Sequence, residues 1–122
     1  MAKSLYERLG RYDAITAVAD DLLPRLASDP LLGRFWTHRS ADGVAREKQL
    51  LIDFLCHSAG GPMYYTGRSM KLSHAGMRIS STDWDAFMKH VRATLDKFNL
   101  PATERNETLA FVEGTRADIV EA

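Results

Sequence analysis

The chain has 122 residues, in which sixteen Lys and Arg side chains balance sixteen Asp and Glu side chains. This length fits one domain, residues 1–122, that can bury a core of its own. The balanced charge disfavours nucleic acid or an anionic membrane as partner, and no apolar run approaches the roughly twenty residues that span a bilayer. A single cysteine and the lack of an apolar leader favour a reducing, cytoplasmic location.

The first part of the chain is predicted to be helical. Residues 4–10 are expected to form one or two short helical turns that end at glycine. Asp13 is then expected to cap a helix whose apolar residues fall at helical spacing from Ile15 to Leu26. Pro24 lies inside this helix and removes one backbone donor, so it should kink or loosen that turn.

A second long helix is expected over residues 44–58, after a short apolar run at 31–36 and a polar connection at 37–43. Glu47 lies one turn before Leu51 on the apolar side of this helix, where its carboxylate either turns inward or extends to solvent. Cys56 has no basic neighbour that would lower its pKa, so it is interpreted as a small core or boundary residue.

The segment from Gly60 to Ile79 is the most informative part of the sequence. Gly60-Gly61-Pro62 should end the preceding helix, and residues 64–68 are expected to be irregular. Met70 and His74 are four apart, so a short helix would place both on one face. An imidazole in these apolar surroundings is either a core histidine that donates to a backbone carbonyl or a metal ligand in a hydrophobic pocket.

The remainder of the chain is predicted to form two further helices. Ser81-Thr82-Asp83 provides a cap and acidic first-turn residues for a helix in which His90 is expected to be solvated. Residues 99–101 break that helix, and Thr103 is expected to cap a final one. No strand pattern competes with these helices, so the predicted fold class is all-α.

Several short patterns stand in a fixed order along the chain. They are Leu-Tyr-Glu-Arg-Leu-Gly at residues 5–10, Phe35, the pair Phe54-Leu55 ahead of Gly60-Gly61-Pro62, and Tyr-x-Gly-Arg-x-Met-x-x-x-His at residues 65–74. The glycine pair is a weak signal by itself, but the combination at this spacing is specific. On these residues the chain resembles the truncated haemoglobins of group I over nearly its full length.

The resemblance implies a shortened globin, a two-over-two helical sandwich around haem b, in which the segment before the proximal histidine is mostly loop. His74 would bind the iron through one imidazole nitrogen, while the other nitrogen needs a backbone acceptor. Tyr65, Arg68 and Lys71, together with Arg46, are candidates for pairing with the haem propionates. The residues expected to contact haem are Phe35, Leu51, Phe54, Leu55, Tyr65, Arg68, Met70, Lys71, Met77, Ile79, Phe87 and Val91.

The chain departs from the family pattern on the distal side. Family members often carry a tyrosine and a glutamine that donate hydrogen bonds to bound dioxygen, whereas Leu23 and Leu51 take these places here, with Glu47 one turn before Leu51. Such a bond contributes roughly 1–3 kcal/mol, so its absence should speed dioxygen release by about ten- to a hundredfold. An ionised Glu47 would repel the ligand and a protonated one would donate to it, and a register shifted by two residues would bring in Gln49.

Three kinds of function remain open at this point. The favoured one is reversible binding of dioxygen, nitric oxide or carbon monoxide at a five-coordinate iron, as in oxygen transport. The second is a haem enzyme, either a nitric oxide dioxygenase served by a reductase or a peroxidase-like activity. The third is a helical bundle that takes up no haem and acts through a partner. His38 or Lys48 as a sixth iron ligand is a further alternative.

Overall fold

The described part of the chain consists of helices and their connections, without strands. The structure is a computed structural model, and it describes residues 3–37, 40–62, 65, 67 and 69–121. The helices are α1 (Leu5–Leu9), α2 (Arg11–Ser28), α3 (Ala41–Ser58), α4 (Met70–His74), α5 (Ser81–Lys97), α6 (Ala102–Glu113) and α7 (Arg116–Ile119), with a 3-10 turn, η1, at Gly33–Phe35. The all-α prediction is therefore confirmed.

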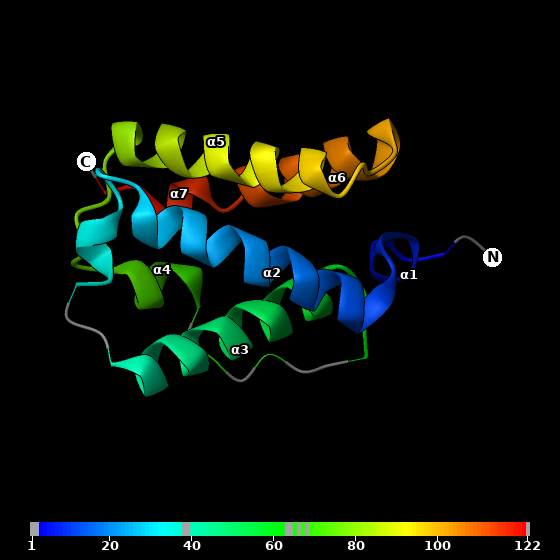
Figure 1. The fold of residues 1–122 in the computed structure, drawn as a ribbon, viewed down its shortest axis with the longest axis horizontal. Coiled ribbons are helices and arrows are strands. Elements are labelled where there is room, and N and C mark those ends of the chain that lie inside the picture. The colour runs from blue at the N-terminus through cyan, green and yellow to red at the C-terminus, as the bar shows by residue number, and fades with distance from the viewer. Residues whose placement is uncertain (1–2, 38–39, 63–64, 66, 68, 122) are drawn as a thin grey trace.

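The long helices form two layers around α2. Figure 1 shows α2 between α3 on one side and α5 with α6 on the other, and α2 packs directly against both α3 and α5. The short helix α4 packs against α7, so a segment from the middle of the sequence meets one from its end. This arrangement is the expected two-over-two sandwich. No helix among the described residues is long and apolar enough to cross a membrane.

The predicted starts of α2 and α6 are wrong. Helix α2 begins at Arg11, immediately after the left-handed Gly10 (φ 111°), so Asp13 lies in its first turn and is not its cap. Helix α6 begins at Ala102 behind Pro101, where Thr103 was expected to be the cap, and a separate short helix, α7, follows it. Pro24 is accommodated inside α2, which continues to Ser28.

Serine caps fix the starts of α3, α4 and α5. The hydroxyls of Ser40, Ser69 and Ser80 accept hydrogen bonds from backbone amides three residues later. At α5 the Asp83 side chain also accepts from the Ser80 amide, which completes a capping box. Because Ser80 occupies the cap position, the predicted cap at residues 81–83 is one residue late.

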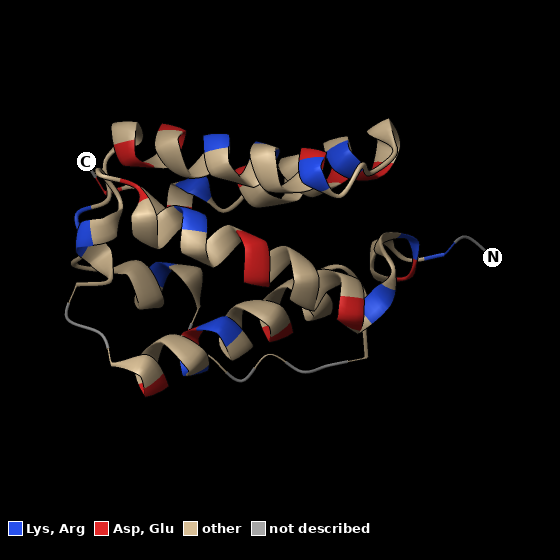
Figure 2. Cartoon of the chain, in the orientation of Figure 1, with Lys and Arg blue, Asp and Glu red and all other residues tan. Residues whose placement is uncertain are grey.

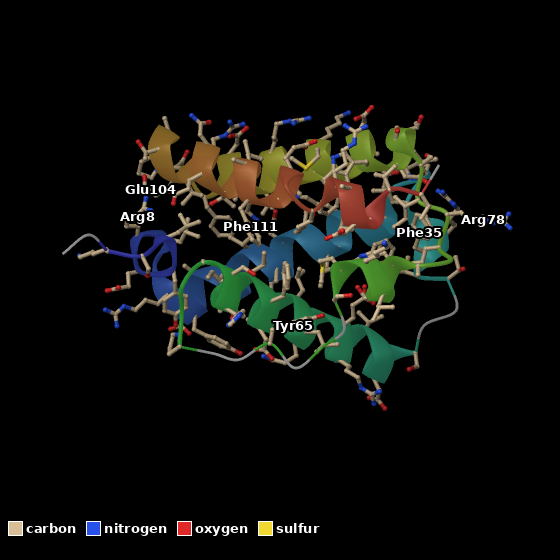
Figure 3. All side chains as sticks on the ribbon, turned by 180° about the vertical axis from the view of Figure 1, so that it is seen from behind. Arg8, Phe35, Tyr65, Arg78, Glu104 and Phe111 are labelled. Atoms are coloured by element: carbon tan, nitrogen blue, oxygen red, sulfur yellow. The ribbon has the colours of Figure 1, made fainter. Side chains whose placement is uncertain are left out.

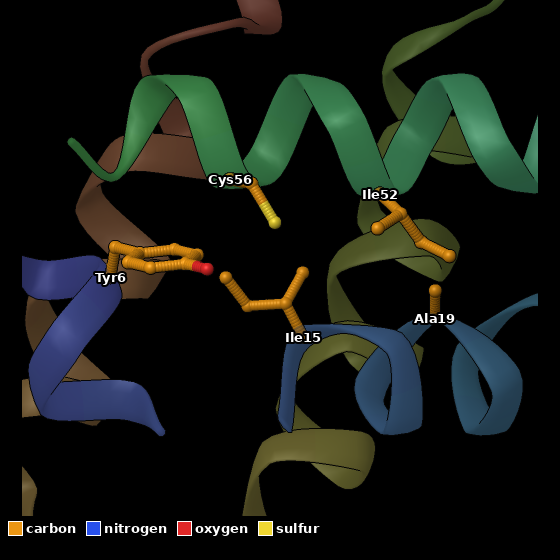
Figure 4. Packing of buried hydrophobic residues seen from close by; sticks show 5 residues of the cluster. All are labelled: Tyr6, Ile15, Ala19, Ile52 and Cys56. Atoms are coloured by element: carbon orange, nitrogen blue, oxygen red, sulfur yellow. The ribbon is translucent and has the colours of Figure 1, made fainter. Parts of the chain in front are cut away.

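One core cluster joins α1, α2 and α3. Figure 4 shows Cys56 and Ile52 of α3 facing Ile15 and Ala19 of α2, with the Tyr6 ring closing the end of the cluster. Cys56 is fully buried, as predicted, and burial raises the pKa of its thiol. Gly61 lies so close to this cluster that a Cβ there would come within 2.7 Å of the Tyr6 ring. This close approach explains a glycine at that position.

Two further clusters connect the layers at the other end. Leu22, Leu26 and Leu32 pack against Val91 and Leu95 of α5, and Ile79, Trp84 and Met88 pack against Ile119. Phe35 and Phe87 contact both clusters. Each fully buried leucine or isoleucine side chain contributes roughly 1.5–3 kcal/mol to folding.

Acidic and basic residues are distributed over the helices, as the colours of Figure 2 show. Arg8 of α1 pairs with Glu104 and Glu107 of α6, at 3.1 and 2.8 Å; Arg8 and Glu104 are labelled in Figure 3. His90 was expected to be solvated, and this expectation is wrong. Its Nε2 lies 2.6 Å from Asp29 Oδ2 in a partly buried contact between α5 and the end of α2.

Candidate functional site

A cavity of about 490 Å³ lies between the layers, and its wall is mostly apolar. Figure 3 labels Phe35, Tyr65 and Phe111, which reach this cavity from η1, from the segment before α4 and from α6. A hydrophobic cavity with a few polar groups is the usual form of a cofactor or small-molecule site.

Most residues that the sequence singled out line this one cavity. They are Leu23, Phe35, Glu47, Leu51, Phe54, Leu55, Tyr65, Met70, His74, Met77, Ile79, Phe87 and Val91. Lys71 is exposed and lies outside the lining. Arg68 lies outside the described residues.

The sequence did not indicate several further lining residues. Trp36 follows η1, Leu22 and Leu26 lie on α2, and Thr108, Phe111 and Val112 lie on α6. The apolar spacing of α2 and α6 predicts a buried face for each helix, but it does not say whether that face borders a cavity or a solid core.

His74 enters the cavity from α4 in a defined orientation. Its Nδ1 lies 2.8 Å from the backbone carbonyl oxygen of Met70 and 3.0 Å from Ser73 Oγ. Because a carbonyl oxygen only accepts, this contact requires the hydrogen on Nδ1. The Ser73 hydroxyl itself donates to the same carbonyl, at 3.2 Å. In a neutral imidazole with its hydrogen on Nδ1, Nε2 carries the lone pair, and this is the form that binds a metal.

An ion pair between the half-exposed Arg34 and the buried Asp83 holds the Phe35 side of the cavity. The guanidinium of Arg34 lies 4.2 Å from the centroid of the Phe35 ring and donates to Asp83 Oδ2 at 2.7 Å. Burial alone would raise the pKa of the Asp83 carboxyl, but the hydrogen bonds from Arg34 and Ser80 outweigh it and lower that pKa. The pair joins η1 to the start of α5 and so fixes the position of Phe35.

Leu23 of α2 and Leu51 of α3 line the cavity without any polar atom in their side chains. Glu47 also lines it, with one carboxylate oxygen buried, so its side chain turns inward. Gln49 instead donates to the Tyr12 hydroxyl at 3.1 Å and to Asp53 at 3.0 Å, and it lies outside the lining. The register that would bring Gln49 to the cavity is therefore not adopted.

Lys48 and His38 are the two side chains that the sequence offers as further iron ligands. Lys48 pairs with Asp20 of α2 at 2.8 Å and does not line the cavity. This ion pair points Lys48 away from the site. His38 lies outside the described residues.

Tyr65 and Arg46 line the cavity and carry groups that could donate hydrogen bonds to an anion. Arg46 lines it from α3 and is otherwise exposed. The Tyr65 ring packs edge-on against Phe54, with centroids 5.2 Å apart, and burial raises the pKa of its hydroxyl. A Cβ at Gly67 would collide with the Tyr65 ring. The glycine of the Tyr-x-Gly-Arg pattern therefore has a steric reason.

A smaller cavity of about 170 Å³ adjoins the main one. Both cavities share Val18, Leu55, Leu95, Thr108 and Phe111, and the smaller one extends between α1 and the loop before α6, where Leu5, Leu9 and Leu100 line it. Its wall is apolar as well.

Comparisons with known proteins agree with this geometry. A family model described as bacterial-like globin matches residues 4–121. A group 1 truncated haemoglobin of Nostoc commune is 33% identical over 88 residues, which cover 72% of each chain. One from Nostoc sp. (strain MUN 8820) is 29% identical over 117 residues, 96% of this chain and 97% of the relative. The truncated haemoglobin of Tetrahymena pyriformis in its Fe(III) form matches with a TM-score of 0.87 at 27% identity, covering 98% of this chain and 100% of that one.

Proposed function

The chain belongs to the group 1 truncated haemoglobins, within the bacterial-like globin family, and we therefore propose that it binds haem in the main cavity, with His74 Nε2 as the iron ligand. The observation that carries the proposal is the contact of His74 Nδ1 with the Met70 carbonyl, 2.8 Å long. It fixes the tautomer and the ring orientation of a histidine at the wall of an apolar cavity, as a proximal haem ligand requires.

The residues around His74 fit the group. Phe35, Met70, Met77 and Phe87 offer aromatic and thioether surface, which suits a large apolar disc. Arg46 at the exposed edge of the cavity suits a carboxylate partner, and it is the described cation best placed to pair with a haem propionate. Haem, when bound, supplies an iron at which a diatomic gas coordinates.

The protein's own contribution to gas binding follows from the cavity wall. Leu23 and Leu51 line the cavity and offer no hydrogen-bond donor. A ligand with partial negative charge, such as dioxygen, is therefore held weakly. We infer reversible binding with fast release of dioxygen. Nitric oxide dioxygenation needs a stable dioxygen complex, and these two leucines provide no polar group that would hold dioxygen.

The test is the absorption spectrum of the reduced protein, recorded without gas and then with carbon monoxide. A broad single visible band that converts cleanly on carbon monoxide is expected for five-coordinate iron on His74. His74→Ala should lose haem on a desalting column, whereas His57→Ala, at the exposed end of α3, should retain it. A wild-type protein that takes up no haem would refute the proposal in favour of a haem-free helical bundle. A sharp split band before any gas is added would refute five-coordination.

A further inference from the structure

The helix that carries His74 is too short to hold its own position. Helix α4 has five residues, whereas isolated helices need roughly 12–15 residues to be even marginally stable in water. In the connection that follows it, residues 75–79, two residues have a left-handed backbone conformation: Gly76 at φ 83° and Arg78 at φ 55°. Contacts from elsewhere in the fold must therefore keep His74 in place.

Glu121 makes two of those contacts through a single carboxylate. Its Oε2 accepts a hydrogen bond from the Gly76 amide at 3.1 Å, and its Oε1 accepts one from the Arg78 amide at 2.8 Å. The Glu121 amide donates to the Ile79 carbonyl oxygen at 2.9 Å. The bonds from Gly76 and then Arg78 lower the pKa of the Glu121 carboxyl, so it is ionised at neutral pH.

These bonds lie two to five residues beyond His74 in the chain. Met77 also donates its amide to the His74 carbonyl oxygen at 3.2 Å, so the connection is hydrogen-bonded to His74 itself. Ile79 and Met77 of the same connection pack in one cluster with Ile119 of α7. The Arg78 side chain is exposed and extends away from the fold in Figure 3, so it is the backbone of this connection that Glu121 holds.

We propose that Glu121 is a positioning residue for His74: by binding the Gly76 and Arg78 amides it sets the angle at which the imidazole meets the haem iron. This inference rests on the proposed function. Without the carboxylate, the two amides turn to water and the left-handed backbone at Arg78 is free to relax to the commoner right-handed region. The end of α4 then shifts, and the bond from His74 to iron is strained or weakened.

The experiment compares the haem-loaded wild type with Glu121→Ala, Glu121→Gln and Glu121→Asp. Asp118→Ala is the matched control, because it removes an exposed carboxylate from α7. The main measurement is the iron–histidine stretching band of the reduced protein by resonance Raman spectroscopy. The second is the rate of haem transfer to an excess of apomyoglobin. The third is amide hydrogen exchange of Gly76 and Arg78 in the haem-free proteins.

Glu121→Ala should shift or broaden the iron–histidine band, speed haem loss by about three- to tenfold and expose both amides to exchange. Glu121→Gln keeps one acceptor oxygen and should show a smaller change, while Glu121→Asp should restore part of the wild-type band. Should Glu121→Ala fail to fold, the Gln variant decides in its place.

An iron–histidine band and a haem-loss rate in the folded variants equal to those of Asp118→Ala would overturn the inference. Faster haem loss with an unchanged band would overturn it too, because it would reduce Glu121 to a general stabilising contact. Failure of the proposed function itself is distinguishable, since the wild type would then show no haem spectrum at all.

Discussion

Leu23 is the position at which the apolar wall of the cavity can be tested most directly. It lines the cavity from α2 and is half-buried. Replacing Leu23 with tyrosine adds a phenolic donor where the chain has none. We expect this change to slow the release of dioxygen.

The size of the effect follows from the hydrogen bond that the new hydroxyl makes. A donor to a partly charged acceptor contributes about 1–3 kcal/mol, and about 1.4 kcal/mol corresponds to a tenfold change. Dioxygen release should therefore slow by roughly ten- to a hundredfold. The larger ring also costs packing energy, about 1–3 kcal/mol where the surroundings are tight. That cost is the same for a phenylalanine, so Leu23→Phe is the matched control.

The assay is stopped-flow measurement of dioxygen release from the reduced wild type, Leu23→Tyr and Leu23→Phe. The tyrosine variant should release dioxygen more slowly than the phenylalanine variant, while both release carbon monoxide, a less polar ligand, at similar rates. Equal dioxygen rates in the Tyr and Phe variants would show that residue 23 does not face the bound gas, and the account of the distal wall would then be wrong.

Two other changes test the cavity and its frame. Glu47→Gln replaces an inward carboxylate by an amide that can donate, so dioxygen release should slow by up to about tenfold; an unchanged rate would place this side chain out of reach of the ligand. Asp21→Ala removes the acceptor of Thr94 Oγ1 (2.8 Å), Lys97 (2.9 Å) and Arg25 (2.8 Å). Because the buried Thr94 hydroxyl is then unpaired, the free energy of unfolding measured in urea titrations should fall by about 1–3 kcal/mol. A loss below the error of the titration would mean that water replaces these bonds. Hydrogen bonds from Lys97 above all, and from Thr94 and Arg25, lower the pKa of the Asp21 carboxyl against the opposing effect of burial. This stabilisation is therefore complete above roughly pH 5 and is lost as the pH falls below the pKa of the unfolded state. A difference in the free energy of unfolding between wild type and Asp21→Ala that stays constant from about pH 7 to pH 3 would contradict the assignment.

Local sequence patterns predicted the helices and the short helix of His74 well. Apolar residues at helical spacing predicted α2, α3 and α5, because one face of each helix must be buried wherever its partner lies. Met70 and His74, four residues apart, do lie on one short helix, and Met70 provides the backbone acceptor for the imidazole. The errors concern helix starts, where Gly10 and Pro101 precede the helices in place of the expected side-chain caps.

Partners distant in sequence could not be predicted from the same patterns. His90 has the spacing of a flanking, solvated residue, yet it meets Asp29, 61 positions away. Lys48 and Gln49 are both polar residues next to the apolar stripe of α3, and their spacing in the sequence does not show which way their side chains point. In the structure, Asp20 of α2 binds Lys48 and Tyr12 of α2 binds Gln49, and these contacts direct both side chains away from the cavity. Such contacts depend on how the layers pack, and periodicity along one helix does not record that packing.

The sequence by itself determined the all-α class, the family resemblance and His74 as the candidate ligand, because helical periodicity and the motif at residues 65–74 are local properties. The tertiary structure decided which faces of the helices surround a cavity, that Glu47 turns inward, and that Glu121 reaches the amides of Gly76 and Arg78 from 45 and 43 positions away. The physical reason is that a cavity is space left between packed layers, so no single helix specifies it, and a five-residue helix takes its position from whatever the rest of the fold packs and bonds against it.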